Sequence, residues 1–253
     1  MQGRLYPNDL KKFNLFPKKW QQEFNQIKKM DFNYLELLYD RKESDINPLV
    51  NKIINYKSVL KHSKNKTYSI NLDFFTRKNF FKNIQNSKKL IKKIINNSNN
   101  LKVKLIVIPC IEKNQMTKKE LIRFINILKK LIVKKKILIS LELNNFNEKV
   151  LRLLNKKIGI CFDTGNLAVH SENYLKKFSK NINKINHIHI KDKKIKNKKF
   201  INCRLGTGIV KFKTFFSILK VKKYKRAITL ETNVGNNPIL EAKKNLNFLK
   251  KYL

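Results

Sequence analysis

Four residues of metal-binding type each stand at the end of an apolar run in the second half of the chain. The runs read "LEL", "CFDTG", "HIHIKD" and "TLETN", and the residues are Glu142, Asp163, His189 and Glu231. Three carboxylates and one imidazole suit a divalent ion such as Mn²⁺, Mg²⁺ or Zn²⁺, because oxygen-rich sites favour the harder ions. A single acid at a strand end often caps a helix, but four such residues at consecutive strand ends indicate a site.

The elements that must position these residues are short apolar runs that alternate with lysine-rich stretches of helical periodicity. The runs predict strands at residues 2–5, 34–40, 68–75, 102–110, 137–145, 158–166, 185–192 and 226–233. The periodic stretches predict helices near 17–30, 47–62, 78–97, 117–134, 147–155, 171–180, 212–220 and 237–253. Near-continuous apolar strands between helices indicate a parallel sheet that is covered by helices.

Eight such units in 253 residues fit a (β/α)8 TIM barrel better than a doubly wound sheet. No glycine-rich phosphate loop follows the first strand, which argues against a dinucleotide-binding fold. The composition shows no linker, so we expect a single domain over residues 1–253. Catalytic residues of such barrels lie at the C-terminal ends of the strands, where the four residues above are placed.

The formal net charge of +41 comes almost entirely from lysine. Binding of nucleic acid or of an anionic membrane is one function of such a charge. The lysines are spread along the whole chain, however, and abundant asparagine and isoleucine beside scarce glycine and alanine are typical of an A/T-rich coding bias. We therefore interpret the charge as a solvated surface, which would still favour a phosphorylated small substrate.

Features of secreted and membrane proteins are missing from the sequence. The cysteines Cys110, Cys161 and Cys203 show no paired spacing and predict no disulfide framework. The first residues have no apolar centre of the signal-peptide type, and no run of about 18 apolar residues predicts a membrane span. These features predict a soluble cytoplasmic protein.

The second half of the chain resembles the xylose isomerase-like TIM-barrel superfamily of sugar and sugar-phosphate isomerases and epimerases, which also includes endonuclease IV. The likeness is closest to the hexulose-6-phosphate isomerase and L-ribulose-5-phosphate 3-epimerase group. It rests on "FDTGN", "HIHIKDKK", "RLGTGIVKF" and "ITLETN" within residues 137–253, and more loosely on "FNYLELLYD". The resemblance implies an isomerase or epimerase that acts on a ketose or sugar phosphate, with homo-oligomers common in the family.

The resemblance also implies one divalent metal ion held by Glu142, Asp163, His189 and Glu231, with Glu142 and Glu231 doubling as the acid/base pair. These two would remove a proton from the carbon beside the carbonyl and return it, while the metal stabilises the enediolate. His187 lies on the same face of its strand as His189 but one layer deeper, and it is predicted to be structural.

Four further residues are candidates for substrate binding. Glu148 matches a substrate-binding carboxylate of related ketose 3-epimerases, although an acid there also suits a helix N-terminus. Lys191 and Arg204 are the best placed cations for a phosphate or for sugar hydroxyls. Asn166 is suited to hydrogen-bond a hydroxyl, and Gly165 before it is expected to let the chain turn away at the barrel mouth.

Asn166 also bears on the alternatives, because many relatives carry a histidine there that endonuclease IV uses toward its multi-zinc cluster. With four histidines in the chain and no Asp-x-His pair after the seventh strand, a trinuclear zinc site is not expected. The nuclease is therefore the weaker alternative, and nucleic acid is not an expected partner. A lyase of the inosose dehydratase type stays open, because its reaction also begins with proton abstraction beside a carbonyl.

Overall fold

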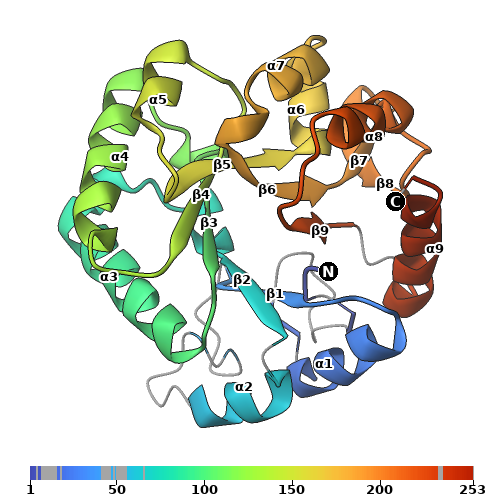
Figure 1. Ribbon diagram of the computed structural model, residues 1–253, viewed down its shortest axis with the longest axis horizontal. Helices are drawn as coiled ribbons and strands as arrows, with labels where there is room; N and C mark the ends of the chain where they lie inside the picture. Colours follow the sequence, from blue (N-terminus) through green and yellow to red (C-terminus); the bar gives the residue numbers. More distant parts are fainter. Residues whose placement is uncertain are drawn as a thin grey trace.

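The computed structural model describes residues 1–3, 5–6, 16–17, 19–40, 47, 49, 56–64, 66–232 and 236–252. Within this part of the chain, parallel strands form one seven-stranded sheet in the order β1-β2-β3-β4-β5-β6-β9. Figure 1 shows these strands as a nearly closed ring with the helices outside it. The prediction of a TIM barrel is confirmed.

The strands of the ring are β1 (Leu35–Leu38), β2 (Thr67–Asn71), β3 (Leu105–Pro109), β4 (Leu138–Glu142), β5 (Ile158–Asp163), β6 (Ile185–Ile190) and β9 (Ile228–Leu230). The helices are α1 (Trp20–Lys29), α2 (Tyr56–Ser63), α3 (Ile84–Asn100), α4 (Lys118–Ile132), α5 (Glu148–Leu153), α6 (Thr164–His170), α7 (Tyr174–Lys180), α8 (Phe212–Val221) and α9 (Pro238–Lys250). Of the predicted elements, residues 4, 18, 48, 50–55, 233 and 253 lie outside the described residues.

The first predicted strand is present as a single bridge rather than as a regular strand. Gln2 pairs in parallel with Glu36 of β1, and the amide of Gln2 donates to the carbonyl of Leu230 at 3.0 Å. The amide of Gly3 donates to the carbonyl of Glu36 at 2.8 Å. The N-terminal residues therefore connect β1 and β9, in the gap where Figure 1 places the N-terminus, and complete the ring.

The helices pack on the ring through apolar stripes. In α4 the buried side chains recur every three or four residues, at Leu121, Phe124, Ile125, Leu128 and Ile132. A capping box between Thr117 and Glu120 fixes where this helix begins. The strands are covered on both faces, and every residue of β3 and β5 is buried, which explains their continuous apolar sequences.

The segment after β5 differs from the prediction. We expected a strand to residue 166 and a turn at Gly165, but β5 ends at Asp163 and α6 begins at the next residue. The Asp163 carboxylate accepts a hydrogen bond from the amide of Asn166 at 2.7 Å and so caps the helix. A side chain at Gly165 would crowd the backbone of Lys191 at 3.3 Å, so glycine here permits close packing of α6 against the end of β6.

An antiparallel hairpin that the sequence did not predict follows β6 and consists of β7 (Asp192–Lys196) and β8 (Lys199–Cys203). Asp192 is fully buried. Its carboxylate accepts hydrogen bonds from the amides of Lys193 at 2.9 Å, Gly206 at 3.0 Å, Gly208 at 2.9 Å and Val210 at 3.2 Å. The aspartate of "HIKD" thereby organises the loop "RLGTG", although eleven residues separate it from Arg204.

Two expectations about the chain as a whole can be compared with the structure. Among the described residues, no helix is both long and apolar enough to cross a membrane. Cys110, Cys161 and Cys203 are buried free thiols.

Candidate active site

A cavity of about 330 Å³ lies at the C-terminal ends of the strands, where the sequence placed the site. Among its lining residues are Glu142 at the end of β4, Asn166 on α6, Lys191 after β6 and Glu231 after β9. All four side chains are at most 8% exposed. The cavity therefore gathers charged groups that burial alone would make unfavourable, which is typical of a functional site.

Asp163, His189 and Glu231 form the centre of this group. One donor atom from each lies within 4.8 Å of the others. Nδ1 of His189 is 2.7 Å from Oε2 of Glu231, although the two are not aligned for a hydrogen bond, and Oδ2 of Asp163 also has no hydrogen-bonding partner among the described residues. Burial alone would lower the pKa of His189, but Cys161, Glu36 and Glu231 raise it well above its usual value.

Lys191 places a positive charge beside these acids. Its ammonium group lies 2.6 Å from Oε1 of Glu231 and 3.2 Å from Oδ2 of Asp163. Burial would lower the pKa of this lysine, but Asp163, Glu231 and Glu142 raise it above its usual value. The hydroxyl of Thr164 fixes the backbone of Lys191, because it accepts from the amide at 2.9 Å and donates to the carbonyl at 2.5 Å.

Glu142 lies at the end of β4 and borders the cavity. Burial, together with the charges of Asp163 and Glu231, raises the pKa of Glu142 to about 8. The side-chain amide of Asn166 donates to Oε1 of Glu142 at 2.7 Å. Asn166 lies in the first turn of α6, which directly follows β5. Its side chain contacts the predicted acid/base residue at the end of β4. Asn166 therefore connects the ends of β4 and β5.

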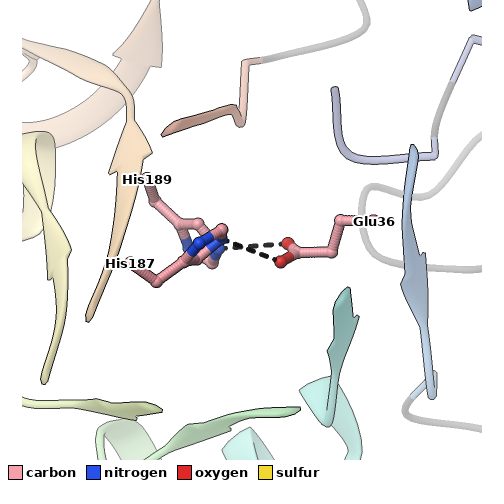
Figure 2. Close-up of side chains that lie close together, drawn as sticks. All are labelled: Glu36, His187 and His189. Atoms are coloured by element: carbon pink, nitrogen blue, oxygen red, sulfur yellow. Dashed lines mark hydrogen bonds and ion pairs between the residues drawn. The ribbon is translucent and has the colours of Figure 1, made fainter. Parts of the chain in front are cut away.

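The sequence analysis missed Glu36, which lies beneath the cavity. Glu36 of β1 is fully buried, and its carboxylate lies 3.0 Å from Nε2 of His189 and 3.2 Å from Nε2 of His187 (Figure 2). The residue could have been found from its context, because "YLELL" repeats the pattern of an acid within an apolar strand that marks Glu142 in "SLEL".

His170 and Lys193 also line the cavity and were not predicted. His170 stands four residues after Asn166, so both lie on one face of α6. Lys193 stands two residues after Lys191, and burial together with the charge of Lys191 lowers its pKa. The helical spacing was a usable signal for His170, whereas Lys193 could not be distinguished among so many lysines.

Glu148 and Arg204, two of the predicted substrate-binding residues, do not line this cavity. Glu148 begins α5 and pairs with Lys180 at 2.8 Å, with 62% of its side chain exposed. Arg204 binds Glu241 of α9 through two hydrogen bonds of 2.8 and 3.0 Å. Arg204 borders a separate cavity that shares Asn202 with the central one.

The donor set fits a divalent metal ion. Asp163, His189 and Glu231 offer two carboxylates and an imidazole at converging positions, and Glu142 borders the same cavity. Burial is the main reason that the pKa of Glu142 is raised to about 8, and repulsion by the carboxylates of Asp163 and Glu231 adds to it. A bound cation would relieve this repulsion, which makes the arrangement suitable for Mn²⁺, Mg²⁺ or Zn²⁺.

A larger groove of about 760 Å³ lies outside this cavity, along the segment from Phe74 to Leu90. Its described lining contains Arg77, Lys78, Lys82 and Lys113 but no acid. It therefore offers no group that accepts a proton at neutral pH and no metal ligand of the usual kinds.

The comparisons with known proteins agree with this geometry. The model of the family of xylose isomerase-like TIM barrels matches residues 24–252. Among curated proteins, none matches the sequence.

Several solved structures share the fold. A zinc-bound IolI protein is 18% identical, with a TM-score of 0.73 over 96% of both chains. D-allulose 3-epimerase from Methylomonas sp., in complex with D-allulose, is 14% identical, with a TM-score of 0.71 over 100% of this chain and 96% of the other. The 3-keto-D-glucoside 4-epimerase YcjR from E. coli is 18% identical, with a TM-score of 0.67 over 99% and 98% of the two chains. At these identities the likeness establishes the fold.

Proposed function

The chain belongs to the xylose isomerase-like TIM barrel family, and from this premise we propose that it is a metal-dependent isomerase or epimerase of a ketose or sugar phosphate. The single observation that carries the proposal is the buried cluster of Glu142, Asp163, His189 and Glu231, of which Glu142 and Glu231 line the cavity. The same four residues were expected from the sequence. Similar folds include epimerases of D-allulose and of a 3-keto-D-glucoside, which supports a sugar as substrate.

In this proposal Asp163, His189, Glu231 and Glu142 hold one divalent ion. When bound, such an ion supplies positive charge that stabilises the negative charge developing on the carbonyl and hydroxyl oxygens of the sugar. Asp163 contributes Oδ2, because its other oxygen already accepts from the amide of Asn166. The N-cap of α6 thus fixes the orientation of this ligand.

Glu142 and Glu231 act as the acid/base pair. The surroundings of each carboxyl group indicate which one accepts the proton and which one returns it. The ion pair between Glu231 and Lys191 requires a carboxylate at Glu231, which therefore accepts the proton from the carbon beside the carbonyl. Burial and the charges of Asp163 and Glu231 raise the pKa of Glu142 to about 8 in the metal-free protein, so its carboxyl group has a high affinity for a proton, and we assign to it the return of a proton to the same carbon or its neighbour. The electron pair of the broken C–H bond moves into the enediolate and back into the new C–H bond.

Lys191, Lys193 and His170 bind the substrate in this proposal. All three line the cavity, and each can donate hydrogen bonds to hydroxyls or to a phosphate. Asn166 orients Glu142 through the hydrogen bond of 2.7 Å. A cavity of about 330 Å³ is of the size that accommodates a small ligand.

The experiment that tests the proposal is incubation with Mn²⁺ and a panel of ketoses and ketose phosphates in D₂O. Deuterium is expected at the carbon beside the carbonyl of at least one substrate, together with its epimer or isomer. Glu142→Gln and Glu231→Gln are each expected to lose this exchange. Glu148→Gln is the matched control, because its exposed carboxylate lies outside the cavity.

The same experiment separates the remaining alternatives. Exchange accompanied by loss of water and formation of an unsaturated product would identify a lyase. Cleavage of abasic DNA without deuterium exchange into any sugar would identify a nuclease and contradict the proposal.

A further inference from the structure

Glu36 is a buried acid that the proposed acid/base chemistry does not use. It comes from β1, across the barrel interior from β6, and its carboxylate points toward the rings of His187 and His189 (Figure 2). Its side chain has no exposed surface. Burial of a charged carboxylate costs free energy unless each of its oxygens is paired. The partners of the Glu36 carboxylate therefore indicate its role.

Each carboxylate oxygen of Glu36 faces a different histidine. Oε1 forms an ion pair with Nε2 of His189 at 3.0 Å, although the two atoms are not aligned for a hydrogen bond, and it accepts from the side-chain amide of Gln2 at 2.8 Å. Oε2 lies 3.2 Å from Nε2 of His187 and accepts from the hydroxyl of Ser69 at 2.7 Å.

The pairing with Oε1 leaves the two nitrogens of His189 in different surroundings. Nε2 faces Glu36, whereas Nδ1 faces Glu231 at 2.7 Å on the cavity side. Gln2 connects the two acids, because its amide lies 2.8 Å from Oε1 of Glu36 and 3.4 Å from Oε2 of Glu231. Nδ1 is therefore the nitrogen that faces Glu231, which belongs with Asp163 to the group of candidate ligands.

We propose that Glu36 is the positioning residue of His189: its carboxylate keeps the proton on Nε2 and aims Nδ1 at the metal. The inference rests on the metal site of the proposed function. A carboxylate behind a ligating imidazole fixes the tautomer and the ring orientation, and loss of such a partner typically weakens metal binding about 10–100-fold. His187 faces the other carboxylate oxygen of Glu36. Its ring stacks on the ring of Tyr68, with the two ring centroids 6.2 Å apart. His187 is therefore a packing partner of the same carboxylate.

The test measures the affinity for Zn²⁺ alone by calorimetry and the ring nitrogens of His189 by ¹⁵N NMR. Glu36→Leu is expected to weaken Zn²⁺ binding about 10–100-fold. Glu36→Gln is expected to retain part of the affinity, because its amide oxygen still accepts from Nε2. Ser69→Ala is the matched control, since it removes a partner of Oε2 only, and its affinity is expected to stay within about threefold of wild type.

If Glu36→Leu does not fold, the NMR spectrum of the wild-type protein still tests the proposal. In the wild-type protein a proton bound to Nε2 of His189 is expected to exchange slowly with solvent, and in the Zn²⁺-loaded protein Nδ1 carries the metal shift. A metal shift on Nε2, or a folded Glu36→Leu protein with wild-type affinity and an unchanged His189 spectrum, would overturn the proposal. If the wild-type protein binds no Zn²⁺, the proposed function fails, while the Nε2 proton of the metal-free protein still decides the role of Glu36.

Discussion

The ammonium group of Lys191 lies 2.6 Å from a carboxylate oxygen of Glu231. Glu231 is also a proposed metal ligand, so a fixed cation shares this acid with the metal. The lysine offsets part of the negative charge of the cluster and lowers its attraction for a divalent ion. This relationship leads to the first prediction.

Replacement of Lys191 by methionine is expected to tighten metal binding and to reduce turnover. Two unit charges 4 Å apart interact by about 1 kcal/mol even in water, and the metal is divalent, so we expect Mn²⁺ to bind about tenfold more tightly or better. Calorimetric titration measures the change. Lys193→Met, which removes a cavity lysine without an ion pair to Glu231 among the described contacts, is expected to give a smaller gain. Equal or weaker binding by Lys191→Met would contradict the proposed competition.

Addition of metal is expected to stabilise the folded protein. At a concentration 100 times the Kd, a ligand that binds only the native state adds about 2.7 kcal/mol, which for a chain of this size raises Tm by roughly 5–10 °C. Thermal scans with and without Mn²⁺ measure this shift. Asp163→Asn should lose it and Glu148→Gln should keep it, because only Asp163 belongs to the buried cluster. An equal shift in both variants would place the metal elsewhere.

Metal affinity is expected to increase with pH. The pKa of about 8 means that the metal-free protein holds a proton on Glu142 below that pH. Binding of the metal must release this proton, together with any proton on the ligating nitrogen of His189, whose pKa is also raised, so the Kd should fall as the pH rises from 6 to 8. Glu142→Gln is expected to show a shallower dependence in the same titrations. A wild-type Kd that is independent of pH over this range would contradict the assignment of Glu142 as a ligand.

Asp192 is expected to contribute strongly to stability. Its carboxylate satisfies four buried or partly buried backbone amides, and Asp192→Ala leaves these donors without an acceptor. We expect a loss of about 3 kcal/mol or more in the free energy of unfolding. Asp192→Asn should be similarly costly, because its amide group would face two donors. Urea denaturation measures both, with Asp31→Asn as the control, since Asp31 is 80% exposed and forms only a surface ion pair.

The order of strands and helices could be predicted because each strand is a continuous apolar run and each helix carries a periodic apolar stripe. The proximity of Glu142, Asp163, His189 and Glu231 could be predicted because each of them ends such a run. The hairpin β7–β8 could not be predicted, because the four residues of β7 after Asp192 are three lysines and one isoleucine, with little burial and no clear alternation. The single bridge at Gln2 could not be predicted either, because it depends on the position of β9 in the folded protein.

Glu36 shows a different limit of sequence reasoning. Its position inside an apolar run predicts burial, but its partners come from β2, β6 and the N-terminus. Only the closure of the barrel brings these segments together. The same holds for Asp192, whose four donors lie in two separate segments of the chain.

The central claim is that one divalent ion binds at Asp163, His189 and Glu231, beside Glu142. The most direct test is an anomalous difference map from crystals grown with Mn²⁺. We expect one strong peak within coordinating distance of Oδ2 of Asp163, Nδ1 of His189 and the carboxylates of Glu231 and Glu142. A peak between Glu36, His187 and His189, which also bring three donor atoms together, or no peak in a folded protein, would contradict it.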